Sequence, residues 1–289
     1  MFFTPVEIAE NFIDTGCKKA GLAVYKQFLL AILAGAFIAF AAEGSNVAIH
    51  TITAVGIQRV LAGTLFAAGL MMVVVAGAEL FTGNTLIVVS CCEKKAAWLA
   101  LLKNWLVVYI GNFLGSILIV YMVLQTGQLN YSGGMLGGLT IKIAAAKTGL
   151  TFAAAFFSGI MCNWLVCIAV WMASGAKDIA GKLISIFFPI WLFVTSGFEH
   201  SVANMYYIPA GILAKANPAW VQQAVALGAK QHAIDVLSWG TFVTNNLIPV
   251  TLGNIVGGGL FVGVVYWLAY LYKSKKKAAA QSYNASASN

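Results

Sequence analysis

Charged residues are scarce in this sequence, at 9% of the chain, whereas hydrophobic residues make up 61% of it. An ordinary soluble domain has about a quarter charged residues. This shortage excludes a soluble globular domain and predicts a polytopic membrane protein. It also leaves no basic domain that would bind nucleic acid, although the formal net charge is +8.

Cysteines are few and odd in number, and two of the five lie within one apolar run: Cys17, Cys91, Cys92, Cys162 and Cys167. This pattern favours packing residues or reduced thiols over a disulfide framework. The cysteines and the three histidines show no metal-ligand spacing. We therefore expect no metal and no cofactor.

The N-terminus lacks the continuous apolar core of a signal peptide, since residues 1–25 contain several acids. The stretch "TPVE" instead predicts the start of a surface helix over 4–20. Thr4 caps this helix, Pro5 fits its first position and Glu7 completes a capping box.

Long apolar regions are what the chain has in abundance. A helix needs about 20 apolar residues to cross the hydrocarbon core. Six regions meet this length: 27–49, 58–90, 104–125, 150–174, 183–213 and 245–272. Regions two and five are too long for one simple span, and each has acidic or amide residues in its second half.

Lysine and arginine positions predict the orientation. Twelve of these residues fall on one side of the predicted membrane and five on the other. This excess places both termini in the cytoplasm. The run "KSKKK" then contacts anionic lipid, and the polar end of the 273–289 tail is predicted to be disordered.

Two motifs recur along the chain in the same order. Residues 77–84 read "GAELFTGN" and residues 197–204 read "GFEHSVAN"; residues 104–115 read "NWLVVYIGNFLG" and residues 246–257 read "NLIPVTLGNIVG". Each copy contains three spans, so the second copy is inserted upside down. The sequence thus predicts one all-α membrane domain over 1–272, with two inverted three-helix repeats at 27–125 and 150–272. A transport path is expected at their interface.

Spans two and five are expected to be broken helices, because an irregular backbone at membrane depth must be buried or line a wet cavity. Each break carries a glutamate and an asparagine: Glu79 with Asn84, and Glu199 with Asn204. A carboxylate is costly at this depth. We expect both to accept hydrogen bonds from the amides of their own loops, as scaffold rather than substrate contacts.

His200 breaks the symmetry of the repeat, because Leu80 holds the matching position. Histidine is the side chain whose ordinary pKa lies nearest neutrality. Most lone histidines are satisfied core residues, but this one lies at a predicted helix break. It is therefore the residue expected to meet the substrate.

The motifs "ELFTGNTLIVV", "KNWLVVYIGNFLG", "CNWLVCIAVWMA", "SGFEHSVANMYYIP" and "NNLIPVTLGNIVGGGL" resemble the formate/nitrite transporter family over residues 5–272. Within the family, the sequences of these motifs most resemble those of bacterial formate and hydrosulfide channels, and "FTGN" is also similar to lactate-carrying members. The resemblance implies an aquaporin-like protomer in a homopentamer, with one anion path per protomer.

The resemblance also implies roles for individual residues. His200, Thr82, Asn254 and Lys147 match the substrate path, with Asn254 facing the histidine and Lys147 at the outer mouth. Two apolar constrictions are implied, one from Leu70 with Phe193 and a cytoplasmic one from Phe66, Leu80 and Phe81. Glu43, late in the first span, receives no role.

The expected function is passage of a small monovalent weak-acid anion, with proton exchange at His200. The expected place is the inner membrane of a bacterium. Formate leads, while hydrosulfide, nitrite, lactate and acetate stay open. A neutral-solute facilitator is the second hypothesis, and Lys147 with His200 argues against it. An intramembrane enzyme is the third, and the lack of a second catalytic carboxylate pair or metal set argues against it.

Overall fold

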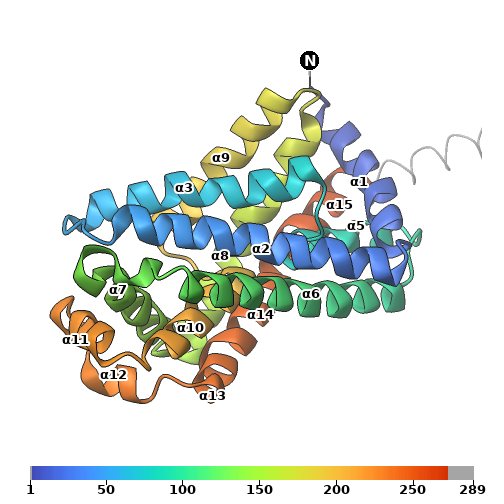
Figure 1. Ribbon diagram of the computed structural model, residues 1–289. Coiled ribbons are helices and arrows are strands. Elements are labelled where there is room, and N and C mark those ends of the chain that lie inside the picture. Colours follow the sequence, from blue (N-terminus) through green and yellow to red (C-terminus); the bar gives the residue numbers. More distant parts are fainter. Residues whose placement is uncertain (1, 273–289) are drawn as a thin grey trace, which may run out of the picture.

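The computed structural model describes residues 2–272, which are almost entirely helical. Figure 1 shows the long helices running side by side through the body of the protein. Six helices are long and apolar enough to cross a membrane: α2 (Val24–Ile49), α3 (Val55–Ala76), α6 (Trp98–Gln125), α8 (Phe152–Gly175), α9 (Ile179–Ser196) and the run Trp239–Tyr270. The predicted all-α fold with six spans is confirmed.

The spans sort their residues by size rather than by polarity. On α2, the large side chains of Leu29, Leu33 and Phe40 are exposed, whereas Ala31 and Ala34 are fully buried. A Cβ at Gly35 would overlap the backbone of α6 at Asn112. Small residues thus let the helix backbones approach closely, which is the usual source of helix association in lipid.

Spans two and five are broken, as predicted. Helix α3 ends at Gly77 (φ 83°) and α9 ends at Gly197 (φ 77°), both in the left-handed region that favours glycine. After the first break, the chain becomes helical again in α4 (Phe81–Asn84), η1 (Thr85–Ile87) and α5 (Val88–Cys92). After the second break, it becomes helical again in α10 (Ser201–Ala214).

The last span is wound irregularly. It consists of α13 (Trp239–Thr241), the π-helical η3 (Phe242–Leu247), α14 (Ile248–Ile255), the π-helical η4 (Val256–Val264) and α15 (Val265–Tyr270). Gly258, within η4, lies against Thr85, Asn163 and Cys167, where a side chain would overlap them. The glycines of this span therefore bring it against α8 and the first broken helix.

Helix α1 (Pro5–Ala20) begins as predicted. The Thr4 N–H donates to Oε2 of Glu7 at 2.6 Å, and the Glu7 N–H donates to Oγ1 of Thr4 at 3.4 Å. The bonds that Thr4 donates to the carboxylate lower the pKa of Glu7. Phe12 stacks on Trp171 of α8 with ring centroids 4.6 Å apart, so this helix is packed against the body of the protein.

Helix α7 (Tyr131–Thr148) was not predicted, because its glycine-rich sequence falls below the length of a span. It follows the 3₁₀ turn η2 (Gln128–Asn130) and packs against α10 and α11 (Pro218–Ala226). Figure 1 shows α7, α11 and α12 (Gln231–Asp235) at the end of the bundle opposite to α1 and α5. The second half of the chain therefore has its own helix before its first span, just as the first half has α1.

The division into a membrane domain over 1–272 and a tail over 273–289 stays a prediction. The basic run "KSKKK" and the tail lie outside the described residues.

Candidate functional site

The two helix breaks meet at the centre of the molecule. In each, four residues join the end of one helix to the start of the next: 77–80 and 197–200. The last residue of each loop occupies the N-cap position of the returning helix: Leu80 before α4, with no side-chain capping bond, and His200 before α10, whose ring accepts the Ala203 N–H. The equivalent loops therefore place an apolar and a titratable side chain at corresponding positions.

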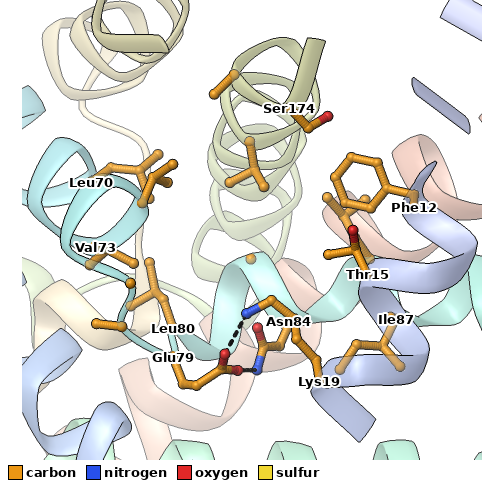
Figure 2. A pocket seen from close by; sticks show the side chains of 18 of the residues that line it. Phe12, Thr15, Lys19, Leu70, Val73, Glu79, Leu80, Asn84, Ile87 and Ser174 are labelled. Carbon is orange, nitrogen blue, oxygen red and sulfur yellow. Dashed lines mark hydrogen bonds and ion pairs between the residues drawn. The ribbon is translucent and has the colours of Figure 1, made fainter. Parts of the chain in front are cut away.

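Glu79 is held by an ion pair and an amide. Its Oε1 accepts from Nζ of Lys19 at 2.7 Å, and its Oε2 accepts from Nδ2 of Asn84 at 2.6 Å, as Figure 2 shows. Asn84 also donates to Oδ1 of Asn104 at 2.9 Å, and Asn104 donates back to the Lys19 carbonyl. The four residues form a closed ring of contacts.

Glu199 repeats this ring in the second half. Its Oε1 accepts from Nζ of Lys147 at 2.8 Å, and its Oε2 accepts from Asn204 at 2.6 Å and Asn246 at 3.1 Å. Asn204 also donates to Oδ1 of Asn246 at 2.7 Å, and Asn246 donates to the Lys147 carbonyl. The two halves thus share a contact set, residue for residue.

These contacts differ from the expected ones in one respect. Loop backbone amides were expected to hold both glutamates, but a lysine and asparagine side chains do so. The backbone amides bind elsewhere: the Glu79 N–H donates to the Leu30 carbonyl and the Glu199 N–H to Oγ of Ser158. A lysine partner offsets the charge of a buried carboxylate, which neutral amides do only in part.

Asn112 and Asn254 clamp the loops to the neighbouring spans. Oδ1 of Asn112 accepts the Phe81 N–H, and its Nδ2 donates to the carbonyls of Ala31 and Glu79. Oδ1 of Asn254 accepts the Ser201 N–H, and its Nδ2 donates to the carbonyls of Gly159 and Glu199. Asn254 was expected to face the path, but its amide is engaged with backbone groups on three sides.

His200 and Thr82 are in direct contact at the centre, with Nε2 of His200 2.9 Å from Oγ1 of Thr82. Nδ1 of His200 accepts the Ala203 N–H at 3.0 Å. Because Nδ1 is an acceptor, a neutral ring has its proton on Nε2 and donates to Thr82. The threonine hydroxyl is then free to donate to a third group.

The Thr82 backbone is fixed by three neighbouring side chains. Its carbonyl accepts from Oγ1 of Thr85 at 2.7 Å, Nδ2 of Asn163 at 3.2 Å and Sγ of Cys167 at 3.3 Å. All three donors are buried. The threonine that meets the histidine is therefore held in place by residues outside the repeat motifs.

Two cavities approach this centre from opposite ends. The α1-side cavity, of about 330 Å³, is lined by Lys19, Leu70, Glu79 and Leu80 among others, most of which Figure 2 displays. The α7-side cavity, of about 480 Å³, is lined by Phe66, Lys147, Phe193 and His200 among others. Asn84 lines the first cavity and Asn204 the second, whereas Asn254 lines neither.

The apolar residues between the cavities are grouped differently from the expected constrictions. Phe66 meets Phe193 edge to face, with centroids 5.8 Å apart, on the α7 side, whereas Leu70 lies with Leu80 on the α1 side. Helix α3 runs from the α7 side to the α1 side, so Phe66 lies one turn, roughly 6 Å, nearer the α7 side than Leu70. Phe81 lines neither cavity, because its ring packs against Trp105 and Tyr109 of α6.

Both cavities have a positive balance of charge. The charged residues that line the α1-side cavity are two cations, Lys19 and Lys182, and one anion, Glu79. Those that line the α7-side cavity are three cations, Arg59, Lys142 and Lys147, and one anion, Glu199. Among residues 2–272, no three histidine, cysteine or acidic side chains cluster as metal ligands would. The geometry suits transient contact with a small anion at either end and neutral donors at the centre.

Lys19 was not predicted as a site residue, although it is the counterpart of Lys147. Lys19 is the penultimate residue of α1 and Lys147 the penultimate residue of α7. The signal was present in the repeat, which extends backwards to a lysine before the first span of each half. The match is short: Lys19 begins "KAGL" and Lys147 begins "KTGL", each directly before the first span of its half.

Glu43 was given no role, and the structure places it inside the protein. It is 5% exposed, and its Oε2 accepts from the hydroxyl of Tyr206 at 2.6 Å. This contact ties α2 to α10.

Known proteins resemble the chain over nearly all of its length. The sequence profile described as "Formate/nitrite transporter" matches residues 6–268. The formate channel FocA of Escherichia coli is 39% identical over 278 residues, 92% of this chain and 94% of that protein. A probable formate transporter of Methanothermobacter thermautotrophicus is 40% identical, over 93% of this chain and 98% of that protein.

Solved structures agree with these sequence comparisons. A pentameric formate channel with formate bound superposes with a TM-score of 0.77 at 43% identity, covering 86% of this chain and 98% of that chain. The residues that match the profile include both helix breaks. The chain belongs to the formate/nitrite transporter family, a family of membrane transporters and channels rather than enzymes.

Proposed function

We propose that the protein passes a small monovalent weak-acid anion, with formate as the leading substrate, across the inner membrane of a bacterium as a homopentamer with one path per protomer. The observation that carries the proposal is the contact of His200 with Thr82 between two positively balanced cavities. The formate channels among the relatives support the substrate, and the pentameric formate channel among the solved structures supports the assembly.

The charges at the two ends attract the anion. An anion entering an apolar constriction loses hydration at a large cost in free energy. A positive cavity raises its local concentration before that step. Lys19 and Lys147 are each paired with a glutamate, at 2.7 and 2.8 Å, so neither offers a bare charge that would trap the anion. The anion is therefore bound weakly, as conduction requires.

The centre offers hydrogen bonds without fixed charge. With Nδ1 of His200 occupied by the Ala203 N–H, the ring donates through Nε2 to Thr82. The Thr82 hydroxyl then donates to the anion. For proton exchange, the ring first takes up a proton at Nδ1, which displaces the Ala203 N–H. The resulting imidazolium passes its Nε2 proton through the Thr82 hydroxyl to the anion, so that the acid crosses in neutral form and the ring is left neutral. The N-terminus of α10, which His200 caps, adds a favourable partial charge for an anion.

The orientation follows from the basic residues. With both termini in the cytoplasm, the α1-side cavity opens to the cytoplasm and the α7-side cavity to the outside. Asn112 and Asn254 act as clamps on the two loops in this proposal, since their amides are engaged with backbone groups.

Uptake into proteoliposomes tests the proposal. Formate, hydrosulfide, nitrite, lactate and glycerol are compared across pH, with empty liposomes as the blank. We expect formate uptake that rises as the outside becomes more acidic, and no glycerol uptake. Glycerol flux without anion flux would show a neutral-solute facilitator instead.

A further inference from the structure

The α7-side cavity contains the only arginine of the chain. All other basic residues of this sequence, apart from the histidines, are lysines. Arg59 lies in the first turns of α3 and lines the cavity together with Lys142, Lys147 and Glu199. An arginine differs from a lysine by its planar fork of five N–H donors, which matches the two oxygens of a carboxylate.

The two lysines of this cavity are already engaged. Nζ of Lys147 is 2.8 Å from Oε1 of Glu199, and Nζ of Lys142 donates to the Leu227 carbonyl at 2.7 Å. Within residues 2–272, by contrast, the Arg59 guanidinium makes neither an ion pair nor a hydrogen bond. Beyond the backbone bonds of α3, Arg59 has one polar contact, in which its carbonyl accepts from the hydroxyl of Thr195. All the donors of this side chain are therefore available.

The guanidinium is nevertheless positioned by the fold. Its Nη1 lies so close to Gly197, at the second helix break, that a Cβ on this residue would overlap it. The C-terminus of α9 ends there, and its partial negative charge attracts a cation. Gly197 leads directly to Glu199 and His200, and Phe66 and Phe193 line the same cavity.

We propose that Arg59 is the residue that recognises the carboxylate on the α7 side, binding both oxygens of a small planar anion before it reaches Phe66 and Phe193. This inference rests on the proposed anion passage and specifies its selectivity. A spherical anion cannot place a separate oxygen on each of two parallel N–H groups of the guanidinium, so Arg59 favours carboxylates and nitrite over halides. If Arg59 only capped α9, it would show no such preference.

Competition against labelled formate uptake in proteoliposomes tests the assignment. Nitrite, which has two coplanar oxygens, and chloride, which has none, are the competitors. We expect wild type to be inhibited by nitrite at far lower concentrations than by chloride. Arg59→Gln should raise the formate concentration for half-maximal uptake about fivefold, as expected for a lost charge-assisted contact. Lys142→Gln is the matched control in the same cavity, and its effect should be smaller.

Arg59→Lys separates the fork from the charge. It keeps the charge and the support of α9, so it also serves if Arg59→Gln is not recovered as an intact oligomer. We expect it to bring the inhibitory concentrations of nitrite and chloride closer together. An unchanged nitrite-to-chloride ratio in Arg59→Lys, or an unchanged half-saturation in Arg59→Gln, would overturn the assignment. Wild type that takes up no formate would overturn the proposed function as well.

Discussion

Lys19 and Lys147 are equivalent residues at opposite ends of the molecule. Each is the penultimate residue of a helix that precedes the first span of its half, and each pairs with the glutamate of the helix break in that half, at 2.7 and 2.8 Å. Each also offers its carbonyl to an asparagine of the third span. The two halves are thus held by the same polar contacts, and they differ at the loop position that is Leu80 in one half and His200 in the other.

The Lys147–Glu199 pair should stabilise the protein only as a pair. Lys147→Met leaves the buried carboxylate of Glu199 without a counter-charge, and Glu199→Gln leaves the ammonium group of Lys147 without one. Breaking a buried ion pair in this way costs about 3–5 kcal/mol. The side chains are 18% and 7% exposed, so solvent reduces the loss below that range. The double variant should be more stable than either single one, as a double-mutant cycle of thermal unfolding in detergent can measure. Additive losses would contradict this coupling.

Replacing His200 should separate its two contacts. His200→Asn retains a side-chain acceptor for the Ala203 N–H but loses the contact with Thr82, whereas His200→Phe loses both. Both variants should lose the pH dependence of formate uptake. The asparagine variant should be more stable than the phenylalanine variant by about 1 kcal/mol, the usual value of a helix N-cap. The exposed His232→Phe serves as the control, and a pH profile like that of wild type in His200→Phe would refute the proton exchange.

Removing an aromatic ring between the cavities should let larger or neutral solutes leak. Phe66→Ala removes one half of the edge-to-face pair with Phe193. Glycerol swelling of proteoliposomes should then become measurable above wild type. Phe40→Ala, at a position 54% exposed on α2, is the control that leaves the permeability unchanged. Equal glycerol flux in both variants would mean that Phe66 is only a packing residue.

Close helix contact at Gly35 should be needed for stability. A Cβ there overlaps the α6 backbone at Asn112, so Gly35→Ala forces α2 and α6 apart. Overpacking of this kind costs about 1–3 kcal/mol. Gly44→Ala on the same helix meets nothing within 4 Å and should be neutral or slightly stabilising. The melting temperatures of the two variants in detergent compare them directly.

Some residues of the site were readable from the sequence and others were not. The repeated Gly-Glu-Asn pattern located both breaks, because a carboxylate that closely follows a glycine is rarely compatible with an unbroken helix that faces lipid. The grouping of Phe66 with Phe193 was not readable, since it depends on how far α3 extends before Gly77. Asn254 was placed on the path by resemblance, whereas the structure engages its amide with three backbone groups.

By itself, the sequence determined the class of protein, the six spans, the two broken helices and the unequal residues Leu80 and His200. These follow from composition and local pattern, because the bilayer requires long apolar runs and internal hydrogen bonding. Only the tertiary structure decided the partners: lysines for the two glutamates, Thr82 for His200, and a place on Gly197 for Arg59. These contacts join residues far apart in the chain, and their distances depend on how the helices pack.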